Sequence, residues 1–200
     1  ITSVCMVESI GGIKADINLN ASKVEIENAI NEVGDEFLTP DKKIINSWKK
    51  LIDDSEKNNI SLGGSGIVIF YDLPVGLGSY VQYDRRLDGI LASVVMSIPA
   101  IKGVEIGNAS EITEMLGNSV DEIKYGEKGF YRIGNYSGGL EGGVTNGQPL
   151  LIRFFMKPLP SNSKVDSVNL ITKKASKPNF YRSDIQAVTA AAVVVESVVA

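Results

Sequence analysis

The 200-residue sequence contains no histidine and only one cysteine, Cys5. Histidine is the usual general base near neutral pH and the commonest metal ligand. Without it, neither a Ser-His-Asp nor a Cys-His catalytic mechanism can be built from this chain, and we expect no metal site. A single cysteine allows no disulfide within the chain, so we expect a reducing compartment and a cytoplasmic location.

The sequence also lacks an excess of positive charge and any long apolar run. Its formal net charge of −4 argues against nucleic acid as the main partner. No run approaches the ~20 apolar residues that span a bilayer, so we expect no membrane partner. The opening at Ile1 is mixed and strand-like, with no basic region of a signal peptide.

The composition is that of an ordinary globular protein, with 44% hydrophobic and 22% charged residues. We expect one domain over residues 1–200. The chain begins without methionine and ends inside an apolar helical pattern, AAAVVVESVVA, that has no stop signal. These two features predict that both ends have been cut.

Hairpins and helices that do not alternate regularly predict an α+β fold, with antiparallel strands packed against helices. Ser22 opens a capping box and hence a helix. Thr39 is the expected cap of a second helix that starts at Pro40, and Asp84 the expected cap of a third that ends at Pro99. The remaining expectations are a hairpin over 1–17 that turns at Gly11-Gly12, strands at 66–71, 102–106, 150–156 and 166–172, a loop-rich stretch over 108–149, and a final helix after Asp184.

The segment NYSGGLEGGVTNGQPLLIRFFMKPLPS, residues 135–161, concentrates glycine ahead of an apolar strand. Its glycines do not fit the GxGxxG spacing or the GxxxxGK[ST] loop that bind nucleotide phosphates. Such a density indicates tight turns, or a backbone that lies close to another strand, a helix or a ligand.

Three short stretches carry groups that could bind an anion or pair with each other. Lys157 through Ser161 (KPLPS) would hold an ammonium and a hydroxyl at fixed positions, or be only a lysine at a strand end with a stiff exit loop. Arg182, Ser183 and Asp184 at a helix start could bind an anion and move a proton, or Ser183 or Asp184 could be only the cap. Lys102 and Glu105 could form a structural ion pair.

Five or six collinear motifs resemble the chorismate synthase family and cover essentially the whole chain. They are SIGGIKAD (9–16), SLGG (61–64), LPVGLGSYVQYDRRLDGILA (73–92), MSIPAIKGVEIG (96–107), the glycine-rich segment 135–161, and YRSDIQAVTAAAVVVESVVA (181–200). The resemblance is to the C-terminal half of that family, and it implies part of the family's β-α-β sandwich.

The resemblance implies a lyase of the shikimate pathway for aromatic amino acids. The family converts 5-enolpyruvylshikimate 3-phosphate to chorismate and phosphate by a 1,4-anti elimination that needs reduced flavin mononucleotide (FMN). Some members reduce the flavin themselves with NADPH, which nothing in this sequence indicates. Family enzymes are homotetramers, so a homotetramer is the expected assembly.

The resemblance also implies a role for each motif at the flavin. Pro99 and Ala100 match positions whose backbone lies against the flavin, and Gly142 matches a glycine that stays bare so that the cofactor can approach. The segment Lys157, Pro158, Leu159, Pro160 and Ser161 matches the one that holds the ribityl phosphate. Arg182 matches an arginine between flavin and substrate, and Asp184 an aspartate that handles a proton near the flavin.

The chain departs from the family pattern in several places. The first half of the family, with its histidine, arginine and serine motifs, is not represented, and Asn59-Ile60 stand where the family usually has Gly-Asp. Val120-Asp121-Glu122 occupies the place of a His-Asp-Glu piece, and Ser183 that of a common histidine. These departures keep open a non-catalytic flavin-binding or structural module, or an inactive fragment, as the alternative. An unrelated flavin-binding protein is disfavoured by the number of collinear motifs.

Overall fold

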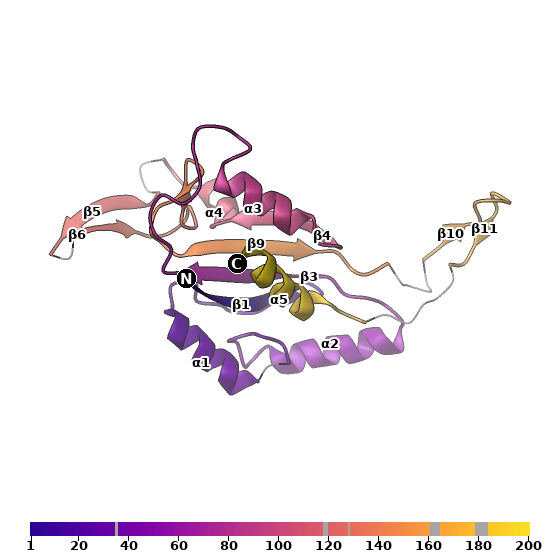
Figure 1. Cartoon of the computed structure of the whole chain (residues 1–200). Helices are drawn as coiled ribbons and strands as arrows, with labels where there is room; N and C mark the ends of the chain where they lie inside the picture. Colours follow the sequence, from indigo (N-terminus) through magenta and orange to yellow (C-terminus); the bar gives the residue numbers. More distant parts are fainter. Residues whose placement is uncertain (35, 118–119, 128, 161–164, 179–183) are drawn as a thin grey trace. The chain divides into compact units, whose positions relative to one another are not determined.

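The computed structural model describes residues 1–200 except 35, 118–119, 128, 161–164 and 179–183 (Figure 1). It contains both helices and strands, in the order β1 (Thr2–Ile10), β2 (Ile13–Lys14), α1 (Lys23–Val33), α2 (Ile45–Lys57), β3 (Gly64–Tyr71), α3 (Leu87–Met96), β4 (Ile101–Ile106), α4 (Ala109–Ile112), β5 (Glu122–Gly126), β6 (Gly129–Ile133), β7 (Leu140–Glu141), β8 (Val144–Thr145), β9 (Leu150–Met156), β10 (Ser167–Val168), β11 (Ala175–Ser176) and α5 (Val188–Val199). The α+β class expected from the sequence is confirmed.

The strands form one five-stranded sheet, in the order β2-β1-β3-β9-β4, and three separate two-stranded hairpins. The hairpins β5–β6, β7–β8 and β10–β11 pair antiparallel, as does β1 with β2. The buried strands β3 and β9 are apolar along most of their length, which is typical of strands covered on both faces.

The chain divides into two compact units. Unit 1 comprises Ile1–Cys5, Ile67–Phe154 and Val194–Ala200, and unit 2 comprises Met6–Gly66 and Phe155–Val193. Strands β1, β3 and β9 each run through both units. The expectation of a single domain is neither confirmed nor contradicted by this division, and each unit is described by itself.

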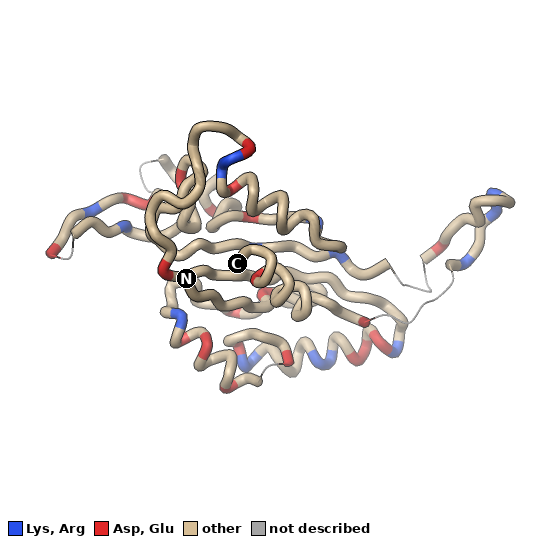
Figure 2. Tube along the Cα trace, viewed as in Figure 1, with Lys and Arg blue, Asp and Glu red and all other residues tan. Residues whose placement is uncertain are grey.

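Unit 2 is built around helices α1 and α2. Ser22 and Glu25 form the predicted capping box at the start of α1, and Ile26 and Ile30 are its buried positions. Trp48 of α2 is fully buried, contacts the ring of Phe37, and donates from Nε1 to the carbonyl of Ile13 at 3.0 Å. Charged residues lie along the length of α2 (Figure 2), and Lys49, Lys50, Asp53 and Asp54 among them are exposed.

The predicted start of the second helix at Thr39-Pro40 is wrong, because α2 begins only at Ile45. Asp41 explains the delay. Its carboxylate accepts from the backbone N–H of Lys43 at 2.9 Å and from that of Asp16 at 3.0 Å, which fixes a turn ahead of the helix. Thr39 is fully buried instead of capping a helix.

Unit 1 places α3 beside strand β4, and the buried residues Leu91 and Val95 form its inner face. The expected cap at Asp84 is wrong, because α3 begins at Leu87. The backbone N–H of Leu87 donates to the carbonyl of Gly143 at 2.9 Å, so a distant loop satisfies the first N–H of the helix, and no side chain at the N-cap, Arg86, does so.

The stretch 108–149 is less irregular than expected. It contains α4 and the hairpins β5–β6 and β7–β8, and the β5–β6 hairpin reaches away from the other strands of unit 1 (Figure 1). The predicted strand at 166–172 is a short hairpin, β10–β11, with two residues in each strand. The strands expected at 66–71, 102–106 and 150–156 are confirmed as β3, β4 and β9.

Candidate functional site

The motif SLGG, residues 61–64, is the centre of a cluster in unit 2. The Ser61 hydroxyl donates to the carbonyl of Leu159 at 2.5 Å. Gly63 leaves no room for a side chain, since an added Cβ would lie 2.5 Å from the carbonyl oxygen of Met156 and 2.9 Å from the ring of Pro158. The backbone after β9 therefore packs directly on this motif, which fixes the exit that begins at Lys157.

The same motif also holds the segment that leads into α5. The backbone N–H of Leu62 donates to the carbonyl of Ile185 at 2.6 Å, and Leu62 forms a parallel bridge with Gln186. Asp184 directly precedes these two residues and is exposed. The structure thus brings the exit Lys157–Leu159 and the segment that begins at Asp184 to the same short motif.

The opening motif, residues 9–16, completes the unit 2 cluster. The backbone N–H of Gly11 donates to the carbonyl of Gly63 at 2.8 Å, and the hydroxyls of Ser9 and Ser65 are 2.8 Å apart. Gly64 lies so close to β1 that an added Cβ would be 2.0 Å from the carbonyl oxygen of Ser9. Glycine is required here because two backbones meet.

The glycine-rich segment forms the centre of a second cluster, in unit 1. An added Cβ on Gly138 would lie 2.3 Å from the backbone of Gly107, and one on Gly139 would lie 2.6 Å from the carbonyl oxygen of Pro149. Gly143 is equally confined, by the side chain of Arg86 and the backbone of Ser79. These glycines serve close backbone packing within the protein.

Gly142 differs from these neighbours. It is exposed, its φ is +60°, and an added Cβ would meet no protein atom within 4 Å. With Gly143 at φ +91° it forms the two-residue turn between β7 and β8, and positive φ at both positions is typical of a type I′ turn. The segment therefore contains buried glycines that face backbone and one glycine that faces open space.

Pro99 and Ala100 form the turn between α3 and β4. Ala100 has φ +70°, a left-handed conformation that costs a residue with a Cβ about 1–2 kcal/mol. Pro99 is exposed and Ala100 is half-buried. Non-glycine residues held in such conformations cluster at functional sites.

Ala100 and Gly142 are not neighbours within unit 1. The β7–β8 turn contacts the N-terminal end of α3, through Gly143 and Leu87, whereas Ala100 follows its C-terminal end. A ten-residue helix is about 15 Å long. The two positions are therefore separated by roughly the length of α3.

Of the remaining predicted site residues, Lys157, Pro158 and Pro160 are exposed, and Leu159 is half-buried. Ser161 and Arg182 lie outside the described residues. Asp184 does not cap the final helix, and Ser183, the other predicted cap, lies outside the described residues. Helix α5 begins at Val188, and the backbone N–H of Val188 donates to the side-chain oxygen of Gln186 at 2.8 Å.

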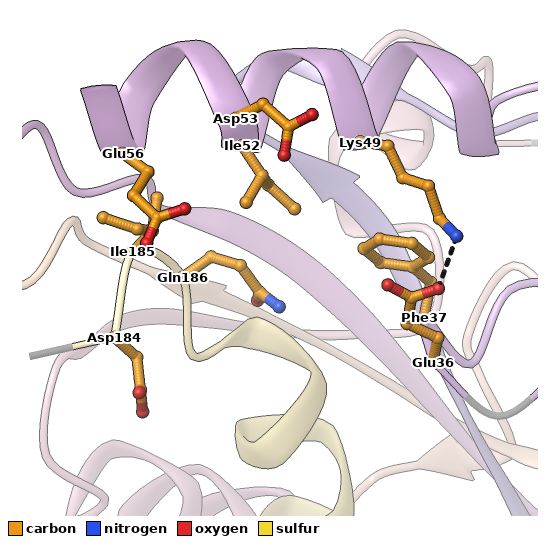
Figure 3. Close-up of a pocket in the computed structure, with 9 residues that line it drawn as sticks. All are labelled: Glu36, Phe37, Lys49, Ile52, Asp53, Glu56, Asp184, Ile185 and Gln186. Carbon is orange, nitrogen blue, oxygen red and sulfur yellow. Dashed lines mark ion pairs between the residues drawn. The ribbon is translucent and has the colours of Figure 1, made fainter. Parts of the chain in front are cut away.

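Asp184 also lines a cavity of about 450 Å³ in unit 2, between α2 and residues 184–186 (Figure 3). Ile52 and Gln186 point into this space, whereas the carboxylate of Asp184 points away from the other side chains. The lining holds four carboxylates and one ammonium, that of Lys49, which pairs with Glu36 at 2.7 Å. This excess of negative charge makes the cavity unsuited to a phosphate.

The expected pair of Lys102 with Glu105 is wrong. Glu105 instead binds Arg153 of the neighbouring strand β9 at 2.9 Å, and the two side chains are only 11% and 13% exposed. The backbone N–H and hydroxyl of Ser110 also donate to Glu105. Arg153 lies in the middle of the apolar strand β9, and the sequence alone did not indicate that its side chain would be paired and nearly buried.

Within the described residues, no group of three or more histidine, cysteine, aspartate and glutamate side chains is placed to hold a metal ion. No helix in the part of the chain that the structure describes is long and apolar enough to cross a membrane.

The two clusters bring together the motifs that resemble one family. Comparison with known proteins identifies the same family. The family model "Chorismate synthase" matches residues 3–200. The chain belongs to the chorismate synthase family. It is 40% identical to the chorismate synthase of Limosilactobacillus fermentum, over 100% of this chain and 52% of that protein.

Other relatives agree. The chorismate synthase of Desulforamulus reducens is 44% identical, over 98% of this chain and 51% of its own length. A crystal structure of chorismate synthase superposes with a TM-score of 0.78 at 35% identity, and the match covers 98% of this chain and 53% of that one. The chain therefore spans about half the length of the relatives that it matches.

Proposed function

We propose that this chain supplies the flavin-binding half of a chorismate synthase active site. The proposed reaction converts 5-enolpyruvylshikimate 3-phosphate to chorismate and phosphate by a 1,4-anti elimination with reduced FMN. The observation that carries the proposal is that family motifs far apart in the sequence meet in two clusters, around Gly63 and around Gly138. Packing of this kind around bare backbone supports a rigid binding surface within each unit.

The phosphate end of the flavin is assigned to Lys157, Pro158, Leu159, Pro160 and Ser161. The Lys157 side chain is exposed, so its ammonium is available to an anion. The backbone behind it is held by Ser61 and Gly63, and the two prolines restrict it further. A charge-assisted bond from a fixed lysine is among the stronger contacts that a protein offers a phosphate.

The flat part of the flavin is assigned to Pro99, Ala100 and Gly142. Open space above Gly142 and the strained turn at Ala100 both fit a backbone that a planar ring approaches. Because these two positions lie at opposite ends of α3, we propose that they contact different parts of the flavin.

Arg182 and Asp184 are assigned to the reaction itself. Departure of phosphate builds up negative charge, which the guanidinium of Arg182 would stabilise by bidentate bonding. The carboxylate of Asp184 would hold or move a proton beside the flavin. Reduced FMN supplies electron density to the substrate when it is bound, while the protein orients the substrate and excludes water.

The proposed partner is the small-molecule substrate, and the proposed assembly is the homotetramer implied by the family. We also propose a cytoplasmic location, because the only cysteine is a buried free thiol. The apolar strand β3 and the valine-rich end of α5 are candidate contacts between subunits, although packing inside one subunit explains buried members of both equally well.

The proposal is tested by incubating the chain without oxygen with reduced FMN and 5-enolpyruvylshikimate 3-phosphate. Chorismate absorbance and free phosphate are followed together. If the chain has no activity alone, the complementary half of the Limosilactobacillus fermentum enzyme is added. Equal amounts of chorismate and phosphate are expected, and they should be lost in Asp184→Asn.

Flavin binding without product, even with the complementary half present, would favour the alternative of a non-catalytic flavin-binding module. An absence of both binding and product under the same conditions would overturn the proposed function altogether.

A further inference from the structure

The backbone that leads to Gly142 is held at both ends by charged side chains from the base of the β5–β6 hairpin. Asp121 lies directly before β5, and Arg132 lies in β6 opposite Ile123. Both are only slightly exposed: Asp121 by 5% and the Arg132 side chain by 16%. Charged groups are rarely buried to this extent unless they are paired.

Asp121 holds the first end of the segment. Its carboxylate accepts from the backbone N–H of Tyr136 at 2.8 Å, through Oδ1, and from that of Ser137 at 2.7 Å, through Oδ2. Asp121 itself has φ +46°, a strained conformation for a residue with a Cβ. Burial alone raises the pKa of Asp121, but hydrogen bonds from Ser137 and Tyr136 and the charge of Arg132 outweigh it and lower the pKa, so the group is a carboxylate near neutral pH.

Arg132 holds the second end. Its guanidinium binds both carboxylate oxygens of Glu141, the residue before Gly142, with Nη1 to Oε1 at 3.0 Å. The same Nη1 donates to the backbone carbonyl of Asp121 at 3.3 Å. Asn146, just beyond β8, donates to Glu141 as well, at 3.2 Å. One connected network therefore spans Tyr136, Ser137 and both sides of the β7–β8 turn.

We propose that Asp121, Arg132 and Glu141 form an ionic clamp that positions the glycine-rich backbone from Tyr136 to Gly143 for the ligand that approaches Gly142. The segment contains four glycines, which by themselves leave the backbone free to adopt many conformations. The clamp removes that freedom without adding bulk on the exposed side of Gly142. These three are positioning residues, and the inference rests on the proposed flavin site.

The clamp also accounts for an otherwise isolated hairpin. A two-stranded hairpin alone is marginally stable in water, and the outer residues Tyr125 and Phe130 are 74% and 80% exposed. Their ring centroids are 4.9 Å apart, and no residue of β5 or β6 is buried. The strands are fixed at their base, where Asp121 and Arg132 contact the glycine-rich segment.

The test compares Asp121→Asn, Arg132→Met and Glu141→Gln with the matched control Glu122→Gln. Glu122 follows Asp121 in the sequence but is exposed and pairs with Lys124 on the hairpin surface. Two quantities are measured in each variant: hydrogen exchange at the amides of residues 136–143, and the dissociation constant of reduced FMN from an anaerobic spectral titration.

Each clamp variant should speed amide exchange over 136–143 and raise the dissociation constant about tenfold, as expected for loss of a bond to a charged group. Glu122→Gln should change neither. Combining Asp121→Asn with Glu141→Gln should raise the dissociation constant by less than the product of the two single effects, because both belong to one network.

Two results would overturn the clamp: exchange over 136–143 that is unchanged in the three variants, or faster exchange with unchanged flavin affinity, which would mark a role in stability alone. A wild-type chain that binds no reduced FMN would instead contradict the proposed function. In that case the exchange data still decide whether the three residues hold the segment.

Discussion

Two explanations for a glycine at position 142 can be tested separately: the turn geometry, which the structure shows, and the approach of a ligand, which the family resemblance implies. Its positive φ explains why the turn needs glycine or asparagine, and the open space above it is what a ligand would require. Gly142→Asn separates the two requirements, because asparagine accepts the left-handed conformation but adds a side chain.

We expect Gly142→Asn to fold with an almost unchanged thermal midpoint and to bind reduced FMN at least about tenfold more weakly, a loss of about 1.4 kcal/mol. Gly12→Asn is the control, since Gly12 also has a positive φ and open space around it but lies in the β1–β2 turn. Equal flavin affinity in the wild type and in Gly142→Asn would leave only the turn as the reason for this glycine.

Cys5 gives a prediction that does not depend on function. Burial raises the pKa of its thiol to about 12, with further contributions from a hydrogen bond and the charge of Glu196. Only the thiolate reacts with disulfide reagents, so native Cys5 at pH 8 should react on the order of 10³-fold more slowly than in urea. Complete labelling of the folded chain within minutes would contradict this.

The same shift has a consequence for stability. A thiol whose pKa is raised on folding contributes stability that is complete below the unfolded pKa of 9.0 and is lost as the pH rises toward 12. The free energy of unfolding should therefore fall more steeply above pH 9 in the wild type than in Cys5→Ala.

At the scale of elements, strands β4 and β9 are joined by the buried pair of Glu105 and Arg153. Removing one member of a buried pair leaves the other charge uncompensated and costs about 3–5 kcal/mol. Urea unfolding of Glu105→Ala should show a loss of this size.

The double variant Glu105→Leu with Arg153→Met should recover most of that stability, because it removes both charges and keeps the volume. If the double variant is no more stable than Glu105→Ala, the uncompensated charge is not the cause of the loss.

The sequence correctly predicted the ends of those elements that are fixed by residues close to them in the chain. The capping box at Ser22 gave the start of α1 correctly, and the glycine pair at Gly11-Gly12 gave the turn between β1 and β2. Helices α2 and α3 begin later than predicted, because their starts depend on distant partners: the backbone of Asp16 for the turn at Asp41, and the carbonyl of Gly143 for Leu87. A single sequence does not show such contacts.

In the candidate site, too, the sequence showed the local motifs but not the distant residues that hold them. The glycine-rich segment and the KPLPS exit stood out in the sequence, but the roles of Ser61 and Gly63 as the support of that exit did not. The clamp residues Asp121, Arg132 and Glu141 were also missed, since they are separated in the sequence and are joined only by the folded hairpin. The motif at Asp121-Glu122 was the single signal that pointed to one of them.

At the scale of the whole molecule, the family motifs form one cluster in each unit. In unit 2 the cluster joins SLGG, the KPLP exit and Asp184, and in unit 1 it joins Gly107 and the glycine-rich segment, with the turn at Ala100 at the far end of α3. The chain spans 52% of the Limosilactobacillus fermentum relative. The central claim is therefore that this half carries the flavin-binding surface of the family.

The most direct test of that claim is an anaerobic titration of the chain with reduced FMN, with and without 5-enolpyruvylshikimate 3-phosphate, followed by the flavin spectrum. We predict saturable binding that tightens when the substrate is present. In Lys157→Ala, the loss of a charge-assisted bond to the phosphate should weaken binding by about 1–3 kcal/mol. A spectrum that does not change at any flavin concentration, both for this chain and after addition of the complementary half of a relative, would contradict the account.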